Sequence, residues 1–475
     1  MAKIISERRL PMLRTPRSAL AILAFLLVLL VPCRSEGRIV SVGLSISRPS
    51  VALSSASAIG AKDGSGKTYS LGKSCEIKAS GKGSVSAGGR TLRLPVTLTS
   101  KSPLSFNGRR YRGSFRVIGD GGGITLVNVL NLEDYLRGVI KMEIDPKWHP
   151  EAVKAQAIVS RTYALRNILQ NKGKKGYDLQ DSVMSQVYRG INAEDKRADQ
   201  AINATRGIVV RYGGSLAFTP FHSDSGGATA DVSTVWGGAM PYLKGVGEPV
   251  PSSSPNSTWE ARLSPSQVES ALRQAGADVG ALRELKIGEK DAFGRATTLV
   301  AVGSGGTKTV KSHAFRMAAG STVIKSTAFS IASASGAGSS PAMPLPLPAS
   351  PALKPSGSGK DVPTSDTPMT PAEERQLTAL TEQGVFTSED LMDMLMNPKK
   401  RKGYLIKALR TRRPELNSPP PAAKTTSQGG LVFRGRGWGH GVGLSQWGAK
   451  ALAEQGWDYR KIILHYFPGV TLGKM

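Results

Sequence analysis

Apolar residues follow two different periods along this chain, and the change comes near residue 124. Between residues 38 and 124, short apolar runs alternate with small or polar residues, as at positions 39–46 and 92–98, and glycine-rich turns separate the runs. Alternation with a period of two is typical of half-buried β-strands. We therefore expect a β-rich lead-in over residues 38–124, including a strand at 110–117, and a further strand at 124–130.

A buried helix is predicted over residues 150–170. Pro150 suits a first helical position, where its missing N–H would have no partner, and the apolar residues after it occupy most of the helix circumference. A helix of that kind is normally buried in a larger domain. The stretch before it, from residue 131, is expected to begin as a strand and to pass through an acidic turn at 142–146. Further helices are predicted at 195–205 and 445–453, and strands at 207–212, 327–331 and 431–433.

Glu143 lies in that acidic turn, between Met142 and Ile144. Apolar neighbours disfavour the ionised form of a carboxyl group and raise its pKa toward the range useful for proton donation. Glu143 is therefore a candidate general acid. The alternative, a carboxylate that only caps a helix or forms a salt bridge, stays open because most carboxylates are solvated.

The composition changes sharply after residue 331. Residues 332–369 are mostly Ser, Ala, Pro and Gly, which predicts a disordered, semi-extended linker. Residues 370–428 are interpreted as a small helical insert with a proline-rich exit, and eight basic residues fall between positions 399 and 413. That basic run is either an amphipathic helix that touches an anionic surface or the solvated face of the insert.

Charge and targeting signals indicate where the protein acts. The chain has 475 residues and a formal charge of +28, which attracts polyanions. Residues 1–37 combine arginines with an uncharged apolar run of about 13 residues, too short for a comfortable membrane span, and are expected to be a signal peptide or an N-terminal anchor. Export across the cytoplasmic membrane argues against nucleic acid as a partner. With only Cys33 and Cys75 in the chain, neither a disulfide framework nor a Cys-based zinc site is expected.

Two glycine-containing segments hold further candidate residues. Glycines at 435, 437, 439, 441 and 443 alternate around Trp438 and His440, and alternate glycines let a backbone approach a ligand closely. With Gln446, this surface is expected to form a polar sugar-binding floor, unless Trp438 and His440 only pack the domain together. His222 and Ser225 suggest a Ser/His nucleophile, but a flexible turn is the better interpretation because Ser225 lacks the flanking pattern of a nucleophile elbow.

Five blocks of sequence together resemble the SpoIID/LytB family, which comprises stage II sporulation protein D and related amidase enhancers. The blocks are residues 131–165 (with GVIKMEI and PEAVKAQAIVSRTYAL), 185–190 (SQVYRG), 204–227 (with ATRGIVV and FHSDSGG), 315–329 (FRMAAGSTVIKSTAF) and 435–468 (with GRGWGHGVGLSQWGAKALAEQG). Together with the strands predicted over residues 38–124, which these blocks do not cover, the resemblance implies an α+β fold in which a β-rich N-terminal part packs on a mixed α/β core. Residues 125–331 and 429–475 are expected to supply that core, on either side of the linker and the insert.

The resemblance also implies an exported protein that remodels bacterial peptidoglycan, in the cell wall, the periplasm or the extracellular space. Sporulation members are lytic transglycosylases that cut glycan strands stripped of stem peptides, and Glu143 matches their catalytic acid, although Met142 stands where members commonly have a small residue. Other members enhance an N-acetylmuramoyl-L-alanine amidase, so a non-catalytic wall-binding enhancer is the alternative. The expected substrate-binding residues are Gln156, Arg161, Tyr163, Ser185, Gln186, Tyr188, His222, Ser225, Trp438, His440 and Gln446.

No metal and no cofactor is expected. Some sporulation members hold a metal through Cys and His near the SQVY segment, and residues 165–190 of this chain contain neither residue type. The expected partners are peptidoglycan glycan strands, an amidase or another cell-wall enzyme, and an anionic wall or membrane surface through the basic insert.

Overall fold

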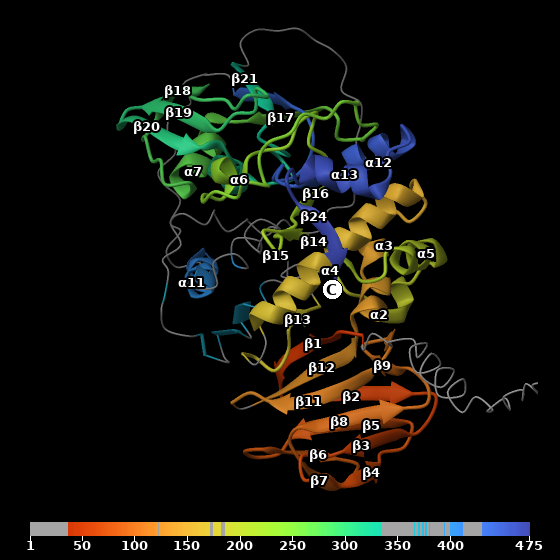
Figure 1. Cartoon of the computed structure of the whole chain (residues 1–475). Helices are drawn as coiled ribbons and strands as arrows, with labels where there is room; N and C mark the ends of the chain where they lie inside the picture. The colour runs from red at the N-terminus through yellow and green to blue at the C-terminus, as the bar shows by residue number, and fades with distance from the viewer. Residues whose placement is uncertain are drawn as a thin grey trace, which may run out of the picture. The chain divides into compact units, whose positions relative to one another are not determined.

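The computed structural model describes residues 37–333 and 430–475, apart from 122, 172–173 and 182–185, together with scattered positions between 365 and 394 and the run 400–411. Residues 39–475 form one compact unit (Figure 1). The predicted signal segment, most of the linker and much of the insert lie outside the described residues. The expected α+β class is confirmed, because strands and helices both build the fold. No helix in the described part of the chain has the length and apolar character needed to cross a membrane.

Two sheets dominate the N-terminal third, as the period of two predicts, and both are antiparallel except where β13 pairs parallel with β1. One sheet has seven strands in the order β13-β1-β12-β11-β8-β3-β4, and the other has six in the order β10-β9-β2-β5-β6-β7. The strands are β1 (Ile39–Arg48), β2 (Ser50–Ser55), β3 (Ile59–Lys62), β4 (Thr68–Ser70), β5 (Ser74–Ala79), β6 (Ser84–Ala87), β7 (Arg90–Arg93), β8 (Val96–Ser100), β9 (Leu104–Phe106), β10 (Arg109–Tyr111), β11 (Ser114–Gly119), β12 (Ile124–Asn131) and β13 (Leu179–Gln180).

The strand predicted at 110–117 is wrong as one element. The chain leaves β10 in one sheet and enters β11 in the other across Gly113. Gly113 has a φ of 75°, which a residue with a side chain rarely adopts, and a Cβ there would collide with the carbonyl oxygen of Val129. The apolar alternation continues across the break, so periodicity alone does not reveal it.

The strand expected to begin at residue 131 is also wrong. β12 ends at Asn131, and two short helices follow, α2 (Leu132–Arg137) and α3 (Ile140–Glu143). The Asn131 side chain accepts a hydrogen bond from the backbone N–H of Glu133, which is the usual cap of a helix N-terminus. The polar residue that looked like the first strand position is therefore the residue that starts the helix.

The long central helix α4 (Pro150–Asn171) is confirmed, and it is buried along most of its length. The elements around it come from both sides of the linker, since α5 (Lys196–Ala204) and β14 (Ile208–Tyr212) contact it together with α12 (Gln446–Glu454) and α13 (Tyr459–Tyr466). The predicted helices at 195–205 and 445–453 and the predicted strand at 207–212 are thus confirmed, with ends shifted by a residue or so. The remaining short elements here are η1 (Gly190–Ala193), β15 (Ser215–Leu216), β16 (Phe221–His222), α6 (Val232–Val235), β23 (Leu444–Ser445) and β24 (Thr471–Lys474).

A second, smaller hydrophobic core lies between residues 259 and 433. Its elements are β17 (Trp259–Leu263), α7 (Pro265–Gln274), β18 (Leu282–Ile287), β19 (Thr298–Gly303), β20 (Gly306–Lys311), α8 (Ser312–Ala319), β21 (Phe329–Ser333) and β22 (Leu431–Gly435). β21 and β22 pair antiparallel, with Ser333 opposite Leu431. The strands predicted on the two sides of the linker are therefore confirmed as neighbours in one sheet, although this subdomain as a whole was not foreseen.

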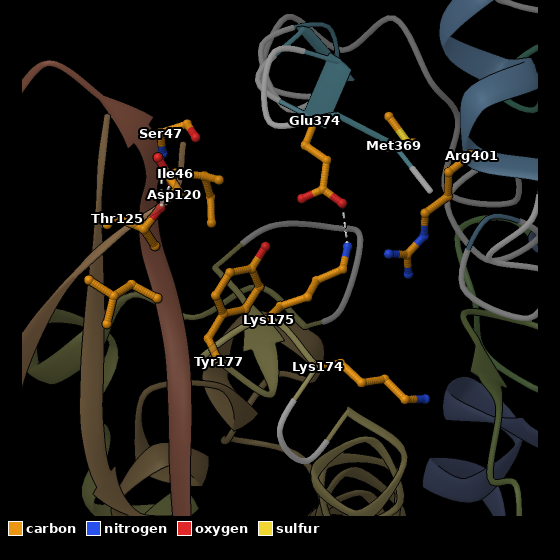
Figure 2. A pocket seen from close by; sticks show the side chains of 12 residues that line it. Ile46, Ser47, Asp120, Thr125, Lys174, Lys175, Tyr177, Met369, Glu374 and Arg401 are labelled. Carbon is orange, nitrogen blue, oxygen red and sulfur yellow. Dashed lines mark hydrogen bonds and ion pairs between the residues drawn. The ribbon is translucent and has the colours of Figure 1, made fainter. Parts of the chain in front are cut away.

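The described residues of the insert contact the loop that follows α4. Glu374 forms an ion pair with Lys175 at 2.5 Å, and Arg401, the first residue of α11 (Arg401–Thr411), faces Tyr177 and Lys174 across a cavity of about 410 Å³ (Figure 2). Tyr404, Leu405 and Ala408 of α11 are buried in a small cluster with Leu377, Leu380 and Met394. This part of the insert thus packs an apolar face of its own.

Candidate functional site

Glu143 is the last residue of α3, directly before the turn that leads into α4. The residue as a whole is partly exposed, whereas its carboxyl group is desolvated. Desolvation raises the pKa of Glu143 from 4.5 to about 7, and a hydrogen bond from the backbone of Val187 offsets part of that rise. A carboxyl group with a pKa near neutrality exchanges its proton readily at physiological pH.

The desolvation of Glu143 does not come from both of its sequence neighbours. Ile144 is buried, but 45% of Met142 is exposed. Two tyrosines from other helices interact with the charge of Glu143. Burial, followed by that charge, raises the pKa of Tyr163. Burial is also the main cause of the raised pKa of Tyr135, and the charge of Glu143 adds to it. The apolar surroundings predicted for this acid are therefore supplied largely by the fold rather than by adjacent residues.

One face of α4 forms a wall behind Glu143. Gln156, Ser160 and Tyr163 recur at helical spacing on that face, and all three are buried. The side-chain amide of Gln156 donates to the Ser160 hydroxyl at 3.1 Å. Gln446, from the first turn of α12, donates to the Gln156 carbonyl at 3.4 Å and to the backbone carbonyl of Glu143 at 2.9 Å.

Gln186 belongs to a third segment that contacts these residues, in addition to α4 and α12. Its side-chain carbonyl accepts a hydrogen bond from the Tyr135 hydroxyl at 3.1 Å, and its amide donates to the Ser160 carbonyl at 3.4 Å. Four of the predicted site residues, Gln156, Tyr163, Gln186 and Gln446, are thus gathered around Glu143. Ser185 lies outside the described residues.

Arg161 and Tyr188 are placed in the interior instead of at this site. The Arg161 side chain is fully buried and forms two hydrogen bonds of 2.9 and 2.8 Å with the carboxylate of Glu133. The Tyr188 hydroxyl donates to Asn128 at 2.8 Å, and its ring packs beside that of Tyr135. Both residues were expected to bind substrate; in the structure both connect elements around α4.

The glycine-rich segment is a tightly wound loop and not a flat floor. Gly437, Gly439, Gly441 and Gly443 all have positive φ angles, between 74° and 127°. The loop packs directly on the segment that contains His222 and Ser225, and a Cβ at Gly439 would lie 2.7 Å from the Cβ of His222.

The candidate residues in these two segments are mostly buried. The His440 ring lies 5.4 Å from that of His222, one of its nitrogens is 3.0 Å from the Phe221 carbonyl, and Ser225 is completely buried. Only Trp438 of this set reaches the surface, with 38% of the residue exposed. The expected sugar-binding floor is therefore corrected to a packed junction, and the turn at Ser225 agrees with the positive φ angles of Gly226 and Gly227.

Two tryptophans that were not expected from the sequence lie next to the site. Trp148 lies in the turn between α3 and α4, and Trp447 follows Gln446 on α12; their ring centroids are 4.6 Å apart. Both are partly exposed. Their positions in the sequence could have indicated this, since Trp148 shares a turn with Glu143 and Trp447 is adjacent to Gln446.

Among the described residues, no group of three or more His, Cys, Asp or Glu side chains is arranged to hold a metal ion. Cys75, on β5, is a free thiol, and burial raises its pKa. The groups gathered at Glu143 are thus one carboxyl group, amides and phenols, which suit proton transfer and hydrogen bonding to hydroxyl-rich ligands.

Comparison with known proteins places this geometry in a family context. Residues 120–212 match the family model described as SpoIID, stage II sporulation protein, a range that includes Glu143, Gln156, Tyr163 and Gln186. An uncharacterized protein of Brachyspira hyodysenteriae is 37% identical over 151 residues, which are 32% of this chain and 41% of that protein.

Two Bacillus subtilis proteins are also similar. The amidase enhancer is 26% identical over 405 residues, covering 81% of this chain and 47% of the relative, and stage II sporulation protein D is 33% identical over 143 residues, covering 27% and 42%. The chain thus spans less than half the length of these curated relatives. The resemblance predicted from the sequence is confirmed, and residues 120–212 match the SpoIID family model.

Proposed function

We propose that this protein remodels peptidoglycan by cleaving glycan strands that lack stem peptides, with Glu143 as both acid and base. The observation that carries the proposal is a desolvated carboxyl group, on a partly exposed residue, whose pKa is raised to about 7. Near neutral pH, roughly half of such groups hold a proton ready for donation. The amide of Gln446 fixes the backbone of this residue, which keeps the acid in one place.

One carboxyl group is sufficient for the proposed reaction. Glu143 donates its proton to the glycosidic oxygen while the bond from that oxygen to the anomeric carbon breaks. The C6 hydroxyl of the same sugar attacks the anomeric carbon, and its proton passes to the Glu143 carboxylate. The product is an anhydro sugar end, no water is consumed, and the acid is regenerated. Ordinary glycosidases instead require two carboxyl groups at a defined spacing.

The second candidate is a non-catalytic enhancer of a cell-wall amidase. The alignment with the Bacillus subtilis amidase enhancer favours it, because that alignment extends over 81% of this chain. The enhancer function requires binding to the wall or to the amidase but no proton transfer. Both candidates act at the wall outside the membrane. The formal charge of +28 would draw the protein to anionic wall polymers.

Digestion of denuded glycan tests the choice. The full chain and its Glu143→Gln variant are incubated with glycan stripped of stem peptides, and anhydromuramic ends are measured by mass spectrometry. We expect such ends from the wild type and a loss of about 10²-fold or more in the variant, the usual scale of acid–base catalysis. Asp145→Asn, two residues away on an exposed side chain, is the matched control.

The possible results separate the candidates. Equal cleavage by Glu143→Gln would remove Glu143 from the mechanism. A preparation that yields no anhydro ends, yet speeds peptide release by an added amidase, would support the enhancer function instead.

A further inference from the structure

Trp148, Trp447 and Lys450 form a small aromatic platform next to the site. The two rings meet at an interplanar angle of 56°. The Lys450 ammonium lies 5.4 Å from the ring centroid of Trp447 and 5.9 Å from that of Trp148. Rings and lysine are all partly exposed, so a ligand can reach them.

The platform is connected to Glu143 from two directions. Trp148 follows Glu143 by five positions, and its backbone N–H donates to the Asp145 carbonyl at 3.1 Å, which tightens the intervening turn. Trp447 is adjacent to Gln446, whose amide donates to the Glu143 backbone. A polymer that reaches the Glu143 carboxyl group is therefore expected to place a neighbouring unit on the platform.

The chemistry of the platform favours a sugar that carries a carboxylate. Aromatic rings offer apolar faces to the C–H face of a pyranose ring, and an ammonium group above them supplies a positive charge for an anion. In the free protein, the Lys450 ammonium contacts Glu454 at 2.8 Å and the Ser253 hydroxyl at 3.4 Å. The Glu454 side chain is 48% exposed, and ion pairs of that kind are weak, so a ligand carboxylate can replace it.

We propose that the platform binds a muramoyl residue and that the Lys450 ammonium forms an ion pair with the free lactyl carboxylate of that sugar. The inference rests on the proposed function, because it takes glycan as the ligand. In a muramoyl unit that bears a stem peptide, the same carboxyl group is an amide and has no charge. Lys450 thereby distinguishes stripped glycan from peptide-bearing glycan, and it is a specificity-determining residue outside the acid–base chemistry.

Binding to two matched oligosaccharides tests the assignment. Both are muramic acid-containing glycan oligomers of one length, one with free lactyl carboxylates and one with those groups converted to methylamides. The full chain carrying Glu143→Gln is used so that cleavage does not interfere, and affinities come from calorimetric titration. We expect the acidic oligomer to bind about 5-fold more tightly, the scale of one partly exposed charge pair.

Three variants in that background isolate the lysine. Lys450→Met is expected to reduce the affinity ratio to about 1, and Glu454→Gln to increase it, because a competing carboxylate is removed. Lys461→Met is the matched control, since the Lys461 ammonium lies 3.9 Å from the ring of a different tryptophan, Trp457, and it should leave the ratio unchanged. Circular dichroism establishes that each variant is folded.

The outcomes keep this inference apart from the proposed function. A ratio that survives Lys450→Met, or that falls equally with Lys461→Met, overturns the role of Lys450 even if the wild type cleaves glycan. A lysine-dependent ratio in a protein that never produces anhydro ends supports the platform while overturning the catalytic proposal.

Discussion

Gln446 donates a hydrogen bond of 2.9 Å from its side-chain amide to the backbone carbonyl of Glu143, although 303 positions separate the two residues. The same amide lies 3.4 Å from the side-chain carbonyl of Gln156. The residue proposed as the acid is therefore held by the last part of the chain as well as by its own helix. A complete site requires both parts of the core, on either side of the linker and insert.

The first prediction concerns this hydrogen bond. Gln446→Ala is expected to lower glycan cleavage about 10-fold, because the backbone at Glu143 loses a restraint and the acid spends less time in the productive position. The loss in the free energy of unfolding should be about 1 kcal/mol, typical of one hydrogen bond. Chemical denaturation and product analysis measure the two effects. Gln455→Ala, at the exposed end of the same helix, is the control, and an equal loss in both variants would contradict the assignment.

The second prediction is a pH dependence set by Glu143. Its folded-state pKa of about 7 lies above the ordinary value of 4.5, so the folded state binds the proton more tightly than the unfolded state. The stabilising effect is fully present below pH 4.5 and is lost as the pH rises through about 7. The unfolding free energy should therefore be measured for Glu143→Gln and the wild type between pH 4 and 9. The stability of the variant relative to the wild type should increase up to about pH 7 and stay constant above that pH.

Cleavage should follow the same group. Above about pH 7, the rate is expected to fall roughly tenfold for each pH unit, since the protonated acid becomes the minor form. A rate that already falls about tenfold per pH unit between pH 5 and 7, with Glu143→Gln inactive, would show that the pKa of Glu143 is not raised in the working enzyme.

The parts of the site that can be predicted from the sequence are those that depend on local patterns, such as helix start signals and apolar periodicity. Pro150 and the apolar circumference after it predict α4, and Ser445 predicts the start of α12, where its side chain accepts a hydrogen bond from the backbone of Gly448. Glu143 and Gln446 belong to blocks that resemble a known family. Local patterns specify where these residues stand on their elements, but the contact between them depends on tertiary packing.

The sequence does not indicate the direction in which a side chain points from its element, and the placement of several expected site residues depends on that direction. Arg161 lies between Gln156 and Tyr163 along α4, but its side chain points to Glu133 while theirs form the wall behind Glu143. A helix that is buried on all sides has no polar face from which to infer that difference. The sugar-binding floor predicted from the alternating glycines differs from the structure for another reason. These glycines adopt the positive φ angles of a wound loop that packs against His222.

The third prediction tests Arg161 as a structural residue. Arg161→Met should destabilise the protein by about 3–5 kcal/mol, because it leaves the buried carboxylate of Glu133 without its partner. Adding Glu133→Gln to that variant should recover part of the loss, since the uncompensated charge is removed. The control is Arg112→Met, which breaks a pair with Glu194 of similar geometry, at 2.6 and 2.7 Å, with the Arg112 side chain 44% exposed; its cost should stay below about 1 kcal/mol. Comparable losses in the two arginine variants would contradict this role.

The last prediction concerns the boundary of the insert, which we propose to be dispensable for the core. Ser333 and Leu431 face each other at the ends of β21 and β22, so a two-residue Asn-Gly turn can replace residues 334–430 as a β-hairpin connection. Removing roughly a hundred residues of loop lowers the entropic cost of closure by about 3 kcal/mol, against a loss of under about 1 kcal/mol for the Lys175–Glu374 ion pair. Calorimetry should therefore show an unchanged or higher unfolding temperature, with glycan cleavage retained and binding to anionic wall polymer reduced. Lys175→Met in the full chain measures the ion pair alone, and a replacement variant that fails to fold while Lys175→Met is stable would show that the insert is part of the core.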